Sequence, residues 1–192
     1  LFGDELIDYI SRNIFRMKRY IFIDYGTVNP MVFLDVYDDN EKLYVVNEYY
    51  YDSKKTGIEK TDLEYGEDLL KFVGDKSITP AYVVIDPSAA SFKVLLRKKG
   101  LRGKVAEDTI NADNKVLEGI RHVSSLLKKK ILLFHKDNCK NTINEMKSYV
   151  WDDKALKNQA KEKPLKIADH GPDAVRYGCF TLINPRRYNN AS

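Results

Sequence analysis

Three short stretches of this sequence hold carboxylates in settings where carboxylates can do chemistry. Asp24 ends the apolar stretch "YIFID", and Asp86 ends "YVVID". A third stretch, "ADHGPDAVRYG", places Asp169, His170 and Asp173 at the start of a predicted helix. One carboxylate is enough to cap a helix start, and each Asp alone is also typical of a cap or a turn. The combination of the three stretches is what indicates a functional site.

We expect Asp24, Asp86 and Asp173 to converge on divalent metal. A carboxylate at the end of a buried strand is costly to leave unpaired. Three convergent carboxylates repel one another, and they stay ionised together only when cations lie among them. Mg²⁺ and Mn²⁺ prefer oxygen ligands of this kind. Two such ions about 4 Å apart can clamp a phosphodiester, because one activates the attacking water and the other stabilises the leaving oxygen.

The predicted helix start offers further candidate ligands. Asp169 lies four residues before Asp173, and His170 lies three before it, so either pair shares a helix face. We expect Asp169 or His170 to be an additional metal ligand, or His170 to transfer protons; a surface or packing role is the alternative for His170. Arg176 is expected to pair with Asp173 or Asp169, or to contact phosphate. Glu48, at a predicted strand end, is a weaker candidate, with a solvated strand terminus as the alternative.

The hydrophobic pattern predicts the elements that must position these residues. Apolar stretches and alternation predict strands, and a 3.6-residue period predicts helices. Strands are expected at 20–26, 31–37, 42–50, 81–86, 103–108 and 131–135, and helices at 4–19, 62–75, 112–130, 138–151 and 172–183, with another helix closing at Gly100. The order is a meander followed by alternating helices and strands. It predicts an α/β fold with a mixed sheet of about five or six strands and helices on both faces.

Length and charge restrict the function further. The 192 residues suit one sizeable α/β domain. From Asp24 to Asp75 there are 13 acidic and 5 basic residues, whereas from Arg121 to Lys166 there are 12 basic and 5 acidic. This asymmetry is compatible with a polyanion that approaches carboxylate-bound metal, and solvated surfaces are the alternative. No apolar stretch approaches the roughly 20 residues of a membrane span, so we expect no membrane partner. Cys139 and Cys179 are expected to be reduced thiols.

Five segments, taken in order, resemble a known family. They are "IFIDYGTVNP", "YVVIDPSAASFKVLLRKKGL", "ADNKVLEGIRHVSSLLKKKIL", "MKSYVWDDK" and "PLKIADHGPDAVRYG", and they span residues 20 to about 180. The chain resembles the C-terminal nuclease domain of the terminase large subunit of tailed bacteriophages, which has a ribonuclease H-like fold. By this resemblance, 20–192 is the nuclease domain. Residues 1–19 are then a linker or helix remaining from the connection to an N-terminal ATPase domain. The sequence lacks a GxxxxGK[ST] phosphate loop, so that domain is expected to be absent.

The resemblance also implies a reaction and partners. It matches Asp24, Asp86 and Asp173 to the family's acidic metal ligands, with His170 and Asp169 beside the last. The expected activity is endonuclease cutting of concatemeric double-stranded viral DNA at the start and end of packaging, using two Mg²⁺ or Mn²⁺ ions. Cutting should leave 3′-hydroxyl and 5′-phosphate ends, with little sequence preference. The expected partners are double-stranded DNA, the small terminase subunit and the portal protein, in the host cytoplasm and transiently at the procapsid portal.

Several alternatives remain open on sequence alone. A junction resolvase-type nuclease or a non-catalytic DNA-binding or assembly module of the same fold is possible. "IDYGT" also resembles a phosphate loop of the actin and sugar-kinase class, but the chain is short and lacks the second loop of that class. The lysine-rich segment 151–166 is expected to form a loop or hairpin that touches DNA. Lys128–Lys130 are interpreted as a basic helix end. Tyr149 and Trp151 are expected to pack in the core rather than to stack on bases.

Overall fold

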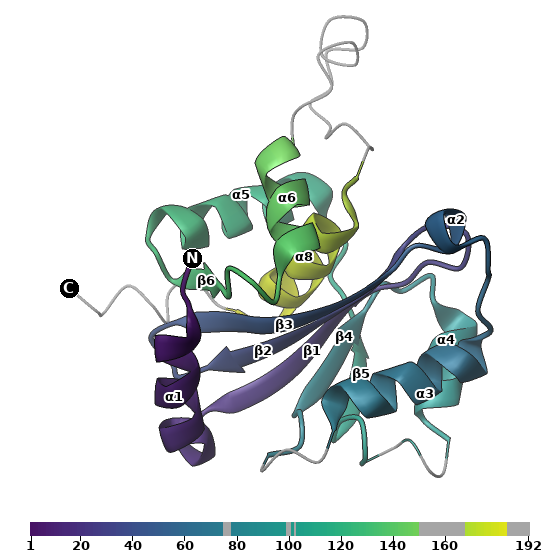
Figure 1. The fold of residues 1–192 in the computed structure, drawn as a ribbon, viewed down its shortest axis with the longest axis horizontal. Helices are drawn as coiled ribbons and strands as arrows, with labels where there is room; N and C mark the ends of the chain where they lie inside the picture. Colours follow the sequence, from purple (N-terminus) through teal and green to yellow (C-terminus); the bar gives the residue numbers. More distant parts are fainter. Residues whose placement is uncertain (75–77, 99–100, 102, 150–167, 184–192) are drawn as a thin grey trace, which may run out of the picture.

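The computed structural model describes residues 1–74, 78–98, 101, 103–149 and 168–183. Its centre is a six-stranded sheet with helices on both faces, as predicted (Figure 1). The strands are β1 Lys18–Asp24, β2 Met31–Asp38, β3 Leu43–Tyr51, β4 Tyr82–Ile85, β5 Asp108–Asn111 and β6 Leu132–Phe134. The helices are α1 Asp4–Asn13, the 3₁₀ turn η1 Ile14–Arg16, α2 Ser53–Thr56, α3 Asp62–Val73, α4 Ala90–Leu96, α5 Val116–Lys128, α6 Lys140–Ser148 and α8 His170–Leu182.

The sheet is mixed, with the strand order β5-β4-β1-β2-β3-β6. β1, β2 and β3 form the expected antiparallel meander, and the β2–β3 pairing shifts register between Asp35 and Val36. β4 pairs with β1 in parallel, β5 with β4 in parallel, and β6 with β3 in parallel. Each parallel pair requires a crossover, and α3, α4 and α5 lie within these crossovers. β1 therefore lies at the centre, between its sequence neighbour β2 and the later strand β4.

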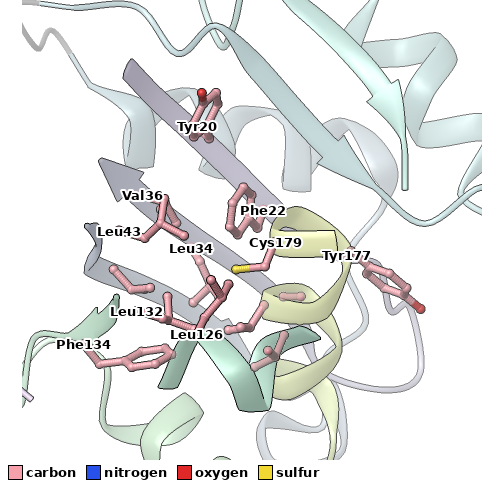
Figure 2. Packing of buried hydrophobic residues seen from close by; sticks show 14 of the residues in the cluster. Tyr20, Phe22, Leu34, Val36, Leu43, Leu126, Leu132, Phe134, Tyr177 and Cys179 are labelled. Carbon is pink, nitrogen blue, oxygen red and sulfur yellow. The ribbon is translucent and has the colours of Figure 1, made fainter. Parts of the chain in front are cut away.

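Two apolar layers cover the two faces of the sheet. On one face, α5, α6 and α8 enclose a cluster that includes Phe22, Leu34, Leu126 and Cys179 (Figure 2). On the other face, α3 and α4 cover a second cluster, and Figure 1 shows these helices across the sheet from α8. A sheet buried on both faces explains why β1 and β2 read as nearly continuous apolar stretches rather than alternating ones.

A close contact between a helix and a strand places α8 directly on the sheet. A Cβ atom added at Gly178 would lie 2.1 Å from the ring of Phe22 on β1, so only glycine allows this approach. On the same helix, Cys179 and Tyr177 point to different sides, as Figure 2 shows, and both belong to the buried cluster that includes Phe22. The first turn of α8 therefore lies near the end of β1, where the predicted site begins.

The N-terminal residues pack onto the sheet as well. Phe2, Ile10 and Met17 form a third apolar cluster with side chains of β2 and β3. Phe2 also forms an isolated bridge with His135, whose Nε2 atom lies 3.1 Å from a carboxylate oxygen of Asp4. Residues 1–17 are therefore attached to the same sheet that carries the site residues.

Some predicted boundaries differ from the structure. The strand expected at 103–108 is wrong: Val105 and Ala106 are buried in a turn closed by the bond from the Gly103 amide to the Ala106 carbonyl. The true strand, β5, follows directly after this turn. The helices predicted at 4–19, 112–130 and 138–151 extend several residues beyond α1, α5 and α6. The helix predicted at 62–75 begins at Asp62 as α3 does, and α8 begins at His170, two residues before the predicted start. No helix in the described part of the chain is long and apolar enough to cross a membrane.

Candidate active site

The ends of two adjacent parallel strands bring Asp24 and Asp86 side by side in the sheet. Ile23 of β1 is paired with Ile85 of β4, and each is followed by its aspartate. The carboxyl ends of parallel strands meet at one edge, which is where α/β proteins place their sites. The sequence pattern therefore located these two carboxylates correctly at neighbouring strand ends.

The start of α8 is held in place by a residue that sequence reasoning missed. The Gly171 amide donates to Oε2 of the buried Glu145 on α6 at 2.6 Å, and Tyr50 donates to the other oxygen at 2.5 Å. Gly171 itself lies against Thr142, because an added Cβ would come within 2.8 Å of the Thr142 Cα. Glu145 follows Thr142 by three positions and so lies on the same buried face of α6. A carboxylate on a buried helix face is the sequence signal that could have identified Glu145 as a site residue.

His170 and Asp24 form a direct contact between α8 and β1. His170 Nδ1 lies 2.9 Å from Asp24 Oδ2, and both side chains are mostly buried. The pKa of Asp24 is raised to about 6, chiefly by burial and also by the negative charges of Asp173 and Asp169, against the lowering contact with His170. Burial alone would lower the pKa of His170, but the Asp24 carboxylate outweighs it, so this pKa is raised.

Asp86 is held by different donors. The Ser88 amide donates to its Oδ1 at 2.7 Å, and Asn114 Nδ2 lies 3.4 Å from its Oδ2. Burial would raise the pKa of Asp86, but hydrogen bonds from Ser88 and Tyr177 and the nearby Arg176 lower it. Asp86 is therefore stabilised as a carboxylate, whereas Asp24 is destabilised as one.

The Tyr177 hydroxyl is hydrogen-bonded to Asp86 and feels the charges of the other two predicted aspartates. Burial, the hydrogen bond to Asp86 and the charges of Asp173, Asp24 and Asp86 all raise the pKa of this phenol. All three carboxylates are therefore within electrostatic reach of a single oxygen atom. Tyr177 follows Asp173 by four positions and so shares its helix face.

Asp173 is paired with a cation of its own helix. Arg176 Nε and Nη2 lie 3.2 and 3.1 Å from Asp173 Oδ1, and both side chains are buried. Nη1 of Arg176 donates to Asn114 Oδ1 at 2.9 Å, and Asn114 in turn contacts Asp86. Of the partners expected for Arg176, the structure therefore gives Asp173. The Arg176–Asn114 bridge connects the second and third aspartates.

The residue types fit a divalent cation, although the present side-chain positions do not form a closed cage. Asp24 has a raised pKa because it is buried near other negative charges, a situation that a cation would relieve. Within the described residues, however, no three His, Cys, Asp or Glu side chains are arranged as a metal-binding group. Asp173 accepts from Arg176 through Oδ1, and Asp86 accepts from the Ser88 amide through Oδ1. Asp169 is the buried N-cap residue of α8.

Glu48 has a different role from the one considered for it. Its carboxylate accepts from the amides of Asn141 and Thr142 at 2.7 and 2.8 Å, at the start of α6. Glu48 is therefore neither a member of the acidic cluster nor a solvated strand end, because it satisfies otherwise unpaired helix amides.

The remaining basic and aromatic candidates are Lys128–Lys130, Tyr149 and the segment that contains Trp151. Lys128–Lys130 are exposed at the end of α5, in agreement with their interpretation as a basic helix end. Tyr149 is half-buried beside Met146, Pro172 and Arg176. The segment 151–166 and Trp151 within it lie outside the described residues.

Comparisons with known proteins give matches among solved structures of phage terminases. Neither a family model nor a curated protein matches the chain. Among solved structures, the large terminase from a thermophilic bacteriophage is 45% identical, with a TM-score of 0.79, over 87% of this chain and 40% of that one. The nuclease domain of the bacteriophage SPP1 large terminase, with bound Mn, covers 85% of both chains at 14% identity and a TM-score of 0.59.

A further nuclease domain has the same fold. The P22 large terminase nuclease domain is 17% identical, with a TM-score of 0.60, over 90% of this chain and 83% of its own. The chain thus spans about 40% of the large terminase from the thermophilic phage and most of the two isolated nuclease domains. The predicted resemblance to a terminase nuclease domain and the ribonuclease H-like fold are confirmed.

Proposed function

We propose, from the premise that this chain is a counterpart of the nuclease domain of phage large terminases, that it hydrolyses phosphodiester bonds of double-stranded DNA. The observation that carries the proposal is that Asp24 and Asp86 follow paired residues of two adjacent parallel strands, and that His170, three positions before Asp173 on α8, contacts Asp24. These residues come from two strand ends and one helix that are far apart in the sequence. A merely structural carboxylate needs no such neighbours, and crowded carboxylates cost stability unless they serve a cation.

We propose Mg²⁺ or Mn²⁺ as the cofactor, with two ions as the working number. The donors are hard oxygen ligands, which suit these ions, and the SPP1 domain of the same fold was solved with bound Mn. Asp24, Asp86 and Asp173 would hold the metal, with His170 or Asp169 as an additional ligand. When bound, such ions supply an activated water and stabilise the leaving oxygen of a phosphodiester.

The side chains of the protein prepare the site for that chemistry. Glu145 fixes the start of α8, so His170 and Asp173 keep their positions relative to β1. Tyr177, Ser88 and Asn114 keep Asp86 ionised and oriented toward the same place. His170 contacts the Asp24 carboxylate through Nδ1 and so orients it at the end of β1. Because these groups are fixed before substrate arrives, little reorganisation is needed during reaction.

The role in packaging rests on the likeness to whole terminases. We propose that the domain cuts concatemeric viral DNA at initiation and termination of packaging, in the host cytoplasm and at the procapsid portal. In that setting it would act with an ATPase domain, the small terminase subunit and the portal protein. Residues 1–19 would connect it to the ATPase domain, and 151–166 would add DNA contacts.

Incubation of the purified chain with DNA tests the proposed activity. Supercoiled plasmid, linear duplex and a four-way junction would each be exposed to the protein with Mn²⁺, Mg²⁺ or EDTA. We expect metal-dependent cutting of plasmid and linear duplex, with 3′-hydroxyl and 5′-phosphate ends. Cutting confined to the junction would favour a resolvase. DNA binding by a folded protein that cuts none of the three would favour a non-catalytic module.

A further inference from the structure

A polar hollow of about 480 Å³ lies directly beside the aspartate cluster. His170 and Glu145 form part of its wall, and the exposed side chains of Lys54 and Lys55 on α2 lie at its rim. We propose that this hollow binds the sugar–phosphate backbone of the DNA strand that is cut, with Lys54 and Lys55 as its phosphate contacts. The inference rests on the proposed nuclease function and adds residues to which that function assigned no role.

The first argument is that the helix carrying the two lysines is held against the loop that follows β1. Ser53 Oγ lies 3.1 Å from the carbonyl oxygens of both Thr27 and Val28, in the loop that directly follows Asp24 and Tyr25. Lys54 Nζ also lies 3.0 Å from Asn29 Oδ1 in that loop. α2 is thus hydrogen-bonded to the loop that directly follows Asp24, the first candidate metal ligand.

The loop that follows β1, and to which α2 is bonded, is itself tightly folded. A Cβ atom added at Gly26 would approach the carbonyl oxygens of Asn29 and Pro30 within 2.5 Å, so the turn is closed tightly on itself. The distance from Asp24 to α2 is therefore set by the fold rather than by a free loop. A phosphate held by Lys54 would stand in a defined relation to the reacting phosphodiester, which is the condition for productive positioning.

The second argument is that the carboxylates of the hollow are already engaged. Glu145 accepts from Tyr50 through one oxygen and from the Gly171 amide through the other. Asp52 caps α2 by accepting from the amides of Lys54 and Lys55. Their charges are therefore partly compensated by protein donors, and the contact of Asp52 with the Lys55 ammonium is a long one of 3.6 Å.

The third argument is the chemistry of the remaining wall. Besides the lysines, the hollow exposes the amide side chains of Asn29, Asn141 and Asn144. Lysines and amides are the groups that proteins use for phosphate and sugar contacts without reading the base sequence. Lys55 lies 3.6 Å from Asp52 with 78% of its side chain exposed, and such a surface pair is weak enough to yield to a phosphate.

Salt-dependent DNA binding in EDTA tests this inference without any cleavage. Fluorescence anisotropy with a labelled duplex would compare the wild type, a Lys54→Ala/Lys55→Ala variant and a Lys54→Arg/Lys55→Arg variant. The matched control is Lys128→Ala/Lys129→Ala, which also removes two adjacent exposed lysines. These lysines precede β6, which pairs with the start of β3, whereas Lys54 and Lys55 follow the end of β3. Thermal unfolding would confirm that all four proteins are folded.

We expect the Lys54→Ala/Lys55→Ala variant to bind more weakly, with a slope of log affinity against log salt reduced by about 2. The arginine variant should restore the slope, and the control pair should leave it close to wild type. An unchanged slope in the Lys54→Ala/Lys55→Ala variant, an equal loss in the control pair, or a wild type that fails to bind duplex at low ionic strength would each overturn the inference. A wild type that binds as expected but cuts no DNA with metal contradicts the proposed function instead.

Discussion

At the residue scale, two aspartates of one site are held in opposite electrostatic conditions. Asp24 is buried near other carboxylates, and its pKa rises from 3.8 to about 6. Asp86 receives hydrogen bonds from Ser88 and Tyr177, which outweigh its burial and lower its pKa. Without metal, the charged form of Asp24 therefore destabilises the folded state, whereas the charged form of Asp86 stabilises it.

This contrast predicts opposite effects of two Asp→Asn substitutions on stability in EDTA. A pKa raised to about 6 means that ionisation of Asp24 costs up to about 3 kcal/mol above that pH, and nothing below 3.8. Asp24→Asn should therefore unfold at higher temperature than wild type above pH about 6, with the difference vanishing as the pH falls below 3.8. Thermal unfolding as a function of pH measures this.

Asp86→Asn provides the matched comparison. Its lowered pKa stabilises the fold above the ordinary value of 3.8, and this contribution is lost as the pH falls through the lower, folded-state value. The Asn variant should therefore be less stable than wild type at neutral pH. A loss of stability in both variants, or a gain in both, would show that the two carboxylates share one environment.

Tyr177 is predicted to act through Asp86 as a positioning residue. Tyr177→Phe removes the hydroxyl that donates to Asp86 but keeps the ring. Loss of a hydrogen bond that orients a metal ligand typically weakens metal affinity or activity about 10- to 100-fold. We expect a weaker Mn²⁺ affinity by calorimetry and a higher Mn²⁺ requirement for cutting, together with a modest loss of thermal stability because the hydroxyl also stabilises the Asp86 carboxylate. An unchanged Mn²⁺ affinity would remove Tyr177 from the site.

At the element scale, the position of α8 on β1 depends on a single glycine. A Cβ at Gly178 would overlap the Phe22 ring at 2.1 Å, in the interior of the sheet. We expect Gly178→Ala to cost about 3 kcal/mol or more in urea unfolding, because neither the helix nor the ring can move far. Gly57→Ala is the control: its φ of +70° strains an alanine, but no atom lies within 4 Å of the added Cβ.

The control should cost about 1 kcal/mol, which is the lower range for a left-handed alanine. If Gly57→Ala proved more destabilising than Gly178→Ala, the close helix–strand contact would be contradicted. A folded Gly178→Ala protein would also report on function, since any displacement of α8 moves Asp173 away from Asp24.

A buried ion pair ties β1 and β2 to the end of α3. Arg19 donates to both oxygens of Asp35 at 2.8 and 3.1 Å and to the Val73 and Ile78 carbonyls. We expect Arg19→Met to cost about 3 to 5 kcal/mol in urea unfolding, because it leaves the Asp35 charge buried without its partner. Arg19→Met/Asp35→Leu should recover much of that loss. A double variant no more stable than the single one would mean that the pair is not the cause.

At the scale of the whole molecule, the sheet order explains what the sequence could predict. Apolar stretches that end in Asp predicted Asp24 and Asp86 at strand ends, and Pro172 with Gly171 predicted the start of α8. These signals are local, and they survive because the strands are buried on both faces. The alternation of elements also predicted the mixed sheet and its two helical layers.

The connections between elements were not predictable in the same way. Glu145, Asn114 and Tyr177 act through hydrogen-bond partners that lie 26 to 95 residues away in sequence. Their types are ordinary in helices and loops, so no local pattern distinguishes them. The false strand at 103–108 has the same origin, because Val105 and Ala106 are buried beneath α4 by tertiary packing rather than by strand pairing.

The central claim is that Asp24, Asp86 and Asp173 form one metal-dependent nuclease site. The most direct measurement is the initial rate of supercoiled-plasmid nicking in Mn²⁺ by wild type, by the three single Asp→Asn variants and by Glu48→Gln. Glu48 is the control carboxylate, since it caps α6 outside the cluster. The account predicts nicking by wild type and Glu48→Gln, abolished by EDTA, and none by the three aspartate variants in their folded state. Wild-type nicking rates in any of the three, or a folded wild type that nicks no DNA with Mn²⁺, would contradict it.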